Sequence, residues 1–279
     1  MIAVDVFHLG PVGALRALPS PSLGTGPDAT AVRLGAVHRS LTGRVTIDRL
    51  AVRRTWALSW PYLDPTVHAF LDALHLGIVP GPLWLLDPQR ANRLTLAVAA
   101  TGSPERTTTG FTATAGTLAW SAAVPVSTLP IAGGLSWAVP AAGGQLAHVD
   151  PVPVLPGETV TASAWVTATV PVRLSVSLYD RTDALLTTVQ SDPITPGAGG
   201  TRLTLPLVPG ATAAFARLAL TVPASTATTL TTAAWQLEAA ATASPWSPGG
   251  GAAVVAVDAL TTAYPVPGTR ATALTLLEV

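Results

Sequence analysis

The chain has 279 residues, only 11% of them charged, and its 15 acidic and 15 basic residues give a formal net charge of zero. At about 150 residues per domain, this length predicts two domains that each bury a core. The neutral balance, without a basic patch, excludes nucleic-acid binding driven by phosphate contacts. It also favours self-association, because no net charge repels a second copy.

The sequence contains no cysteine, which excludes a disulfide framework, a thiolate nucleophile and a cysteine-based zinc site. Residues 1–13 lack a basic leader, and Asp5, His8 and Pro11 interrupt their apolar residues. A membrane-spanning helix needs about 20 apolar residues. We therefore expect neither a secretory signal nor membrane insertion.

The first hundred residues predict a mainly β domain with one short helix. Apolar alternation indicates strands at about 1–9, 31–38, 44–52, 53–60, 81–86 and 94–99. Residues 41–43 suit a turn, while Asp64 and Pro65 predict the start of a helix and Gly77 its end. Residues 10–28 are rich in proline and glycine, so we expect either a flexible linker or an arm that packs on a neighbouring subunit.

From about Thr107 the composition shifts toward Thr, Ala, Val and Pro, with ten charges in the 144 residues up to Gly250. Strand patterns recur at a spacing typical of a β-sandwich, at about 159–168, 172–179, 184–189, 201–207, 214–222 and 229–237. Within the first of these, apolar residues from Val160 to Val166 alternate with polar or larger ones. This middle part therefore predicts a β-sandwich domain.

Three glycines, residues 249–251, precede two further predicted strands at about 253–260 and 269–279. Twenty-nine residues are too few to build a core, so these strands are expected to complete the sheet begun by residues 1–100. The predicted organisation is a discontinuous domain, 1–104 plus 252–279, interrupted by an inserted domain at 105–251.

Motifs for enzyme catalysis are missing. The sequence has no G-x-S-x-G element and no glycine-rich phosphate loop. Glycoside hydrolysis needs two carboxyl groups about 5–10 Å apart, for which the insert offers Glu158, Glu238 and four aspartates. We expect no enzyme activity, no catalytic residue and no cofactor.

His68, Asp72 and His75 fall at spacings that place them on one face of the predicted helix, where they could hold a metal. The alternative is that they form its solvent-facing side, opposite Phe70 and Leu74. We favour this alternative and expect no metal site.

Eight tryptophans suggest carbohydrate binding, because an aromatic ring can stack on the apolar face of a sugar. Trp165 and Trp235 lie in alternating strands and are expected in the core. Trp120, Trp137 and Trp246 lie in less regular surroundings, so these three are the candidate carbohydrate-binding residues.

The insert resembles jelly-roll carbohydrate-binding modules. Its segment PGETVTASAW, residues 156–165, matches the pattern of their entry strand, in which PG-x-T leads to a hydrophobic residue and then to S-x-aromatic. Its close, WQLE at 235–238 followed by ASPWSP at 243–248, is similar to the ending of such modules on phage tail proteins. The resemblance implies a jelly-roll β-sandwich over about residues 107–248.

The flanking segments resemble the N-terminal domain of distal tail proteins and related minor tail proteins of long-tailed phages. The cues are RTWALSW at 54–60, the helix to Gly77, GPLWLLDP at 81–88, and Asn92. The resemblance implies a β-sandwich or barrel-like domain of the tail-tube type that assembles into a ring, usually a hexamer. Its partners would be further copies of itself, the tail tube and tail-tip hub proteins.

The expected function is that of a structural virion protein of the phage tail tip, whose ring joins the tail tube to the baseplate. It would be made in the host cytoplasm without a signal peptide and released by lysis, which agrees with the missing export signal. The alternative is a glycan-binding protein that recognises the host cell wall during attachment. A third possibility, a wall-degrading enzyme, would depend on Glu158 or Glu238.

Overall fold

The computed structural model describes the chain except for residues 1–5, 23–27, 49–50, 104 and 267–268. Strands make up 48% of the residues and helices 6%, which confirms the predicted mainly β fold. The chain forms two compact units, each described by itself below. The flanking unit consists of Val6–Leu85 and Ala253–Val279, and the sandwich unit of Leu86–Ala252.

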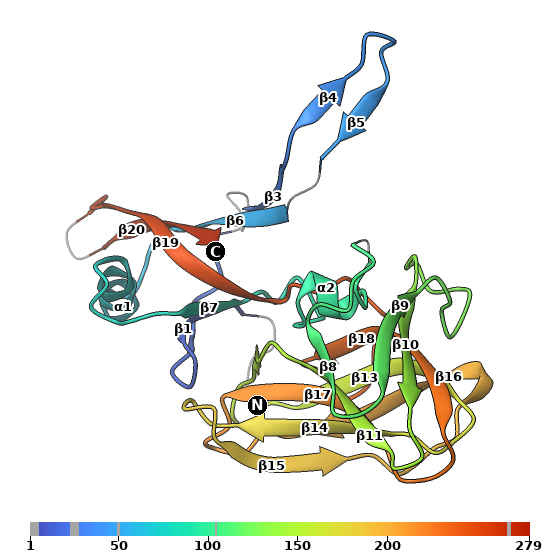
Figure 1. Cartoon of the computed structure of the whole chain (residues 1–279). Helices are drawn as coiled ribbons and strands as arrows, with labels where there is room; N and C mark the ends of the chain where they lie inside the picture. Colours follow the sequence, from blue (N-terminus) through green and yellow to red (C-terminus); the bar gives the residue numbers. More distant parts are fainter. Residues whose placement is uncertain (1–5, 23–27, 49–50, 104, 267–268) are drawn as a thin grey trace. The chain divides into compact units, whose positions relative to one another are not determined.

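The flanking unit contains a seven-stranded sheet in the order β2-β1-β7-β19-β20-β6-β3 (Figure 1). Its strands are β1 (His8–Pro11), β2 (Arg16–Ala17), β3 (Asp28–Leu34), β6 (Ala51–Trp60), β7 (Leu83–Leu86), β19 (Ala252–Ala263) and β20 (Ala271–Glu278). β20 pairs antiparallel with β6 from Thr272 opposite Trp60 to Leu277 opposite Thr55. The C-terminal strands therefore share one sheet with strands from the first hundred residues.

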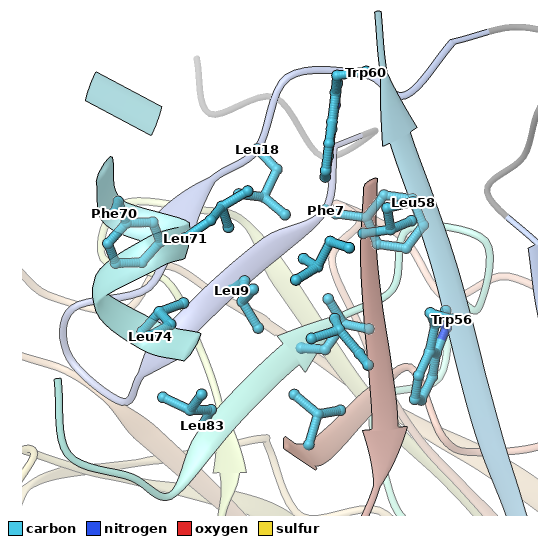
Figure 2. Packing of buried hydrophobic residues seen from close by; sticks show 14 of the residues in the cluster. Phe7, Leu9, Leu18, Trp56, Leu58, Trp60, Phe70, Leu71, Leu74 and Leu83 are labelled. Atoms are coloured by element: carbon cyan, nitrogen blue, oxygen red, sulfur yellow. The ribbon is translucent and has the colours of Figure 1, made fainter. Parts of the chain in front are cut away.

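Helix α1 (Pro65–His75) covers one face of this sheet and closes the core of the flanking unit (Figure 2). The carboxylate of Asp64 accepts a hydrogen bond from the backbone N–H of Thr66 at 2.8 Å, which caps the helix as predicted. Gly77 follows the helix with φ +69°, a conformation that favours glycine. The core consists of large aromatic and aliphatic side chains: Phe7, Leu9, Leu18, Trp56, Leu58, Trp60, Leu63, Phe70, Leu71, Leu74, Leu83, Leu85, Val255, Leu274 and Leu276.

A buried ion pair joins the two chain segments of the flanking unit. The guanidinium of Arg54 donates to both carboxylate oxygens of Glu278, at 3.1 and 3.0 Å, and lies over the ring of Trp56. A bidentate pair of this kind is strong because both charges keep their hydrogen bonds when they leave water. It fixes the last strand of the chain beside β6.

The proline-rich segment is folded rather than free over residues 10–22. β1 and β2 form a hairpin, Leu18 is 2% exposed, and the indole of Trp60 donates to the carbonyl of Pro19. The expected flexible linker is therefore wrong for this stretch, because β1 and β2 pair and Leu18 is buried in the core of their own unit. Packing of this stretch on a neighbouring subunit stays a prediction. Residues 23–27, and the part of the predicted first strand at residues 1–5, lie outside the described chain.

Residues 28–48 form a projecting ribbon made of β3, β4 (Val37–Arg39) and β5 (Val45–Ile47) (Figure 1). β4 pairs with β5 around the predicted turn at 41–43, with Val37 opposite Ile47. Every residue from 28 to 48 is exposed. We call this ribbon the arm.

The sandwich unit contains two sheets, one in the order β16-β13-β18-β10-β9 and one in the order β15-β14-β17-β11-β8, with β12 paired to β17. The first comprises β9 (Thr117–Ser121), β10 (Gly134–Val139), β13 (Val160–Ala168), β16 (Gly197–Leu207) and β18 (Thr228–Glu238). The second comprises β8 (Phe111–Ala113), β11 (Gly144–His148), β12 (Val152–Pro153), β14 (Arg173–Tyr179), β15 (Leu185–Gln190) and β17 (Phe215–Val222). Their facing sides bury alternate residues, as in a jelly-roll β-sandwich.

The first residues of the sandwich unit differ from their predicted structure and place. Residues 94–99 were expected as a strand of the flanking domain, but Leu96–Ala99 form the short helix α2. The hydroxyl of Thr95 caps this helix, which buries Val98 and Ala99 and leaves Leu96 exposed. Residues 86–103 contact the sandwich, so the unit begins at 86 and not at the expected 105.

A buried ion pair holds this entry segment to the sandwich. The guanidinium of Arg93 donates to both carboxylate oxygens of Glu158, at 2.5 and 2.8 Å. Glu158 also accepts the backbone N–H of Leu155 at 2.6 Å. Both side chains are at most 8% exposed, so the pair is shielded from solvent. Removing either partner would leave a buried charge uncompensated.

Asn92 joins the places where the chain enters and leaves the sandwich unit. Its amide nitrogen donates to the carbonyls of Trp235 and Ser247, each at 3.0 Å. Its amide oxygen accepts the N–H groups of Leu94 and Leu237, each at 3.2 Å. Asn92 is fully buried and uses its donors and its acceptor, so we call this arrangement the clasp.

The glycines at 249–251 allow the exit segment to pass close to the entry segment. A Cβ at Gly251 would lie 2.3 Å from the carbonyl oxygen of Arg90, and one at Gly249 would lie 2.2 Å from that of Leu94. Gly250 has φ +99°. Larger residues would therefore force the two segments apart.

We expect Asn92→Ala to lower the free energy of unfolding of the sandwich unit by on the order of 3 kcal/mol, because buried backbone groups lose their partners. Chemical denaturation followed by tryptophan fluorescence would measure this loss. Gln89→Ala, at an exposed position in the neighbouring turn, is the control. Equal stability of the Asn92→Ala protein and the control would contradict the role of the clasp.

His148, at the end of β11, is 1% exposed in the sandwich core. Burial lowers the pKa of its imidazole to about 4; the backbone of Asp150 opposes this shift and the charge of Arg217 adds to it. The folded sandwich therefore holds a neutral histidine over a range in which an unfolded chain takes up a proton. The contribution of this neutral histidine to the free energy of unfolding is fully present above about pH 6.5 and is lost as the pH falls toward 4.

Acidification from pH 7 to 4 should therefore cost the wild type about 3 kcal/mol more than a His148→Leu variant, which has no proton to take up. Carboxylates titrate in both proteins, so the difference between the two stability curves isolates the histidine. Parallel curves would show that His148 is accessible to protons in the folded state.

Candidate carbohydrate-binding surface

Strand β13 has one side in the core of the sandwich unit and the other side on the outer face of its sheet. Val160, Ala162, Ala164 and Val166 are all 0% exposed and face the second sheet. Because successive side chains of a strand point to opposite faces, Trp165 lies on the outer face, where it is partly exposed. The expectation that Trp165 belongs to the core is therefore wrong. The alternation of small apolar residues along its own strand already indicated that Trp165 faces the other side.

Hydroxyl side chains lie to one side of Trp165 on this outer face, and its direct cross-strand neighbours are Ala233 of β18 and Arg202 of β16. Strand pairing places Ser136 of β10 opposite Thr231 of β18, and Thr231 opposite Thr167 of β13. Two residues further along, Thr117 and Thr229 both pair with Ala138. The hydroxyl face consists of Trp165 with Thr117, Ser136, Thr167, Thr229 and Thr231, all of which are partly or fully exposed.

The hydroxyl face continues into a shallow pocket of about 480 Å³. Thr117 and Thr229 belong to both, and Gly116, Ala138 and Pro140 also line the pocket. With a rise of about 3.4 Å per residue, the four residues from the level of Trp165 to that of Thr229 span about 14 Å. That length accommodates a short oligomer rather than a single small molecule.

A loop borders the hydroxyl face at β16. A Cβ at Gly200 would lie 2.5 Å from the carbonyl oxygen of Pro125, so the connection between β9 and β10 passes directly over that glycine. Only glycine permits this approach, since Gly200 also has φ +71°.

The other half of the same outer face is covered by a buried polar cluster. Glu238 accepts hydrogen bonds from the amide of Gln236 at 2.7 Å and from the hydroxyl of Ser244 at 2.6 Å. Arg202 donates to the carbonyl of Ser244 and to the hydroxyl of Ser163. Partial burial lowers the pKa of Arg202, and the charge of Glu238 opposes that shift. This cluster joins β13, which carries Trp165, to the neighbouring strands β16 and β18.

Trp137 cannot contribute to a surface site. It is 0% exposed, faces the core from β10, and its indole donates to the carbonyl of Ala115 at 2.8 Å. The expectation that it is exposed is wrong because β10 is a regular strand whose inward positions include Leu135 and Val139. Its irregular sequence context gave no indication of this.

Trp120 and Trp246 are both partly exposed. Trp120 ends β9 with the guanidinium of Arg106 5.3 Å from its ring centre. Its indole N–H is buried and has no hydrogen-bond partner among the described residues. Trp246 packs beside α2 and donates to the carbonyl of Ala99 at 3.2 Å. Trp235, expected in the core, is 0% exposed.

The carboxylates considered for hydrolysis have structural partners. Glu158 pairs with Arg93, and Glu238 accepts from Gln236 and Ser244. Both are at most 3% exposed. Neither is placed to exchange protons with a bound sugar.

The proposed metal-binding face of α1 is not assembled. The ring of His68 contacts the hydroxyl of Thr262 at 2.8 Å and the guanidinium of Arg270 at 3.0 Å, whereas Asp72 and His75 are exposed. In the described part of the chain, no three histidine, aspartate or glutamate side chains gather as metal ligands. Neither described helix is long and apolar enough to cross a membrane.

No protein family and no curated protein matches the sequence. Among solved structures, the chain is similar to the enzymatically active domain of tailspike protein 4 of bacteriophage CBA120, with 14% identity and a TM-score of 0.45. The match covers 53% of this chain and 21% of the tailspike domain, so it spans about a fifth of that domain.

Two carbohydrate-binding modules are also similar. A family 61 module in complex with β-1,4-galactotriose matches with 11% identity and a TM-score of 0.37, over 53% of this chain and 99% of the module. The family 22 xylan-binding domain of Xyn10C from Paenibacillus barcinonensis matches with 16% identity and a TM-score of 0.36, over 49% of this chain and 90% of the domain. These similarities concern the fold of the sandwich alone.

Proposed function

We propose that the sandwich unit binds a glycan on the hydroxyl face and serves in attachment to a carbohydrate-coated surface. The observation that carries the proposal is the position of Trp165: a partly exposed indole on a sheet face where Ala233 and Arg202 are its direct cross-strand neighbours and where threonine and serine side chains follow. A large aromatic side chain in such surroundings offers an apolar platform that no side chain of its own unit covers completely.

Sugars present what this face can bind. The apolar face of a pyranose stacks on an indole ring, while its hydroxyls exchange hydrogen bonds with Ser136, Thr167 and Thr231. These hydroxyl side chains are uncharged, which suits a neutral glycan, while the charged Arg202 opposite Trp165 donates to Ser163 and to the carbonyl of Ser244. Trp120 and Trp246 remain proposed carbohydrate contacts because each is partly exposed, although Trp120 pairs with the inward-facing Leu135 and therefore does not belong to the hydroxyl face. Trp137 is fully buried and is no longer a candidate.

Replacing Trp165 by alanine should weaken glycan binding by at least about tenfold, because one central aromatic side chain commonly supplies much of the binding energy of such a surface. Binding to purified bacterial cell walls and to immobilised oligosaccharides of β-linked hexoses and pentoses would measure the loss. Trp165→Phe should retain most of the binding, since the ring remains.

Tyr264→Ala is the matched control, because Tyr264 is an aromatic residue 69% exposed in the flanking unit. Unchanged binding by Trp165→Ala, or a wild type that binds none of these materials, would contradict glycan recognition at this face.

A second candidate function is that of a structural virion protein of a phage tail tip, which assembles into a ring, a hexamer in the family it resembles. It would join the tail tube to hub proteins of the baseplate. The observation that favours it is the exposed arm of the flanking unit, a surface suited to contacts with other subunits. Both functions fit one protein, since a tail-tip ring that displays sandwich units would present many glycan-binding faces at once.

Gold labelling of purified tailed virions with an antibody against the sandwich unit would test the second function. We expect label at the tip of the tail, in numbers consistent with a ring. Label that is absent from intact particles, or that lies on the capsid, would contradict it.

A further inference from the structure

The outward side of β13 changes from exposed to buried along the strand. Thr167 and Trp165 are partly exposed, as members of the hydroxyl face. The next two residues on the same side, Ser163 and Thr161, are only 0% and 1% exposed. Because alternate residues of a strand share one side, these four side chains follow one another on the outer face. The hydroxyl face therefore ends at Trp165.

Residues that follow the end of β18 cover the outer face beyond Trp165. The hydroxyl of Thr161 donates to the carbonyl of Ala240 at 2.7 Å. Gln236, which lies on the same side of the sheet, is 0% exposed and donates to the hydroxyl of Ser244 at 3.0 Å. This segment lies over the two strands and closes the outer face at that end, so a ligand on the hydroxyl face cannot continue past Trp165.

The connection between β9 and β10 bounds the same end of the hydroxyl face. It leaves β9 at Ser121, which pairs with Gly134. A Cβ at Gly134 would lie 3.2 Å from the Cβ of Ala233, the cross-strand neighbour of Trp165, so the loop begins at the level of Trp165. It then passes over Gly200 of β16, at the opposite edge of the sheet. Because the second sheet covers the inner face, the loop reaches β16 across the outer face.

The opposite end of the hydroxyl face is open. It continues into the shallow pocket of about 480 Å³, where Thr117, Ala138 and Thr229 are exposed. β9 begins at Thr117, β10 ends at Val139 and β18 begins at Thr228, so all three strands terminate at this end. The hydroxyl face is therefore a groove that is closed beyond Trp165 and open at the pocket.

We propose that this groove receives the end of a glycan chain and not an internal stretch of it. The terminal sugar stacks on Trp165 at the closed end, the next sugars lie over Ser136 and Thr231, and the chain leaves through the pocket. An internal stretch continues on both sides, and one side would meet the segment that covers Gln236. The proposal rests on glycan recognition at the hydroxyl face, to which it adds the part of the glycan that is bound.

Limited hydrolysis of one polysaccharide tests the proposal, because cutting multiplies the chain ends at constant mass. The probe is soluble polysaccharide released from purified bacterial cell walls, before and after partial acid hydrolysis into chains that are still longer than the groove. A reducing-sugar assay counts the chain ends, and isothermal titration calorimetry with the full chain counts the binding sites. We expect the number of sites per gram to increase by the same factor as the number of chain ends.

The failure of this proposal differs from the failure of glycan recognition. If the number of sites per gram stays constant or falls on hydrolysis, the protein binds internal stretches. That result would overturn end recognition and leave glycan binding in place. Polysaccharide that binds in neither form would contradict glycan binding itself, and end recognition with it.

Ala138→Trp tests where the chain leaves the groove. Ala138 is exposed in the pocket, and a large ring there would obstruct the open end, so we expect at least about tenfold weaker binding of the hydrolysed chains. Thr112→Trp, at an exposed position of β8 in the second sheet, is the matched control. Thermal unfolding would verify that both variants are folded. Equal binding by the two variants would overturn the proposed path of the chain.

Discussion

The clasp at Asn92 is the contact on which the discontinuous fold depends. A chain that leaves the flanking unit for 167 residues and then returns to it must bring its points of exit and return together, because β7 and β19 are neighbours in the flanking sheet. Asn92 holds both ends with one side chain, through hydrogen bonds to Trp235 and Ser247. The glycines at 249–251 remove the side chains that would keep the two segments apart.

This arrangement explains why the sandwich can tolerate a low charge. Its interior is held by the alternation of small apolar residues along long strands, and its few charges are used in pairs and clusters. The entry segment is held by the pair of Arg93 and Glu158. The exit segment is held by the hydrogen bonds of Glu238 with Gln236 and Ser244. The other half of the outer face is then left to Trp165 and the hydroxyl side chains, with Arg202 at the border between the two halves.

Strand positions could be predicted from the sequence wherever alternation was regular, and α1 could be predicted from Asp64, Pro65 and Gly77. The pairing of β20 with β6 agrees with the expectation that the C-terminal strands return to the first sheet. Residues 94–99 show the limit, because a short apolar run is compatible with a strand or with a buried helical turn, and only the capping contact of Thr95 distinguishes them. We predicted exposed tryptophans from the irregular sequence around them. In the structure, exposure depends instead on which side of its strand a residue occupies: Trp137 is at an inward position of β10, and Trp165 is at an outward position of β13.

The arm and the sandwich core show why alternation alone does not reveal the partner of an apolar face. Val160 to Val166 and Val45 to Ile47 both alternate, and both patterns indicate a strand with one side to be covered. In β13 a second sheet of the same unit covers that side, whereas β4 and β5 have no second layer in the flanking unit. Apolar alternation indicates that one side of a strand favours burial, but it does not indicate which part of the protein covers that side. The arm is therefore a segment whose apolar side stays exposed within its own unit.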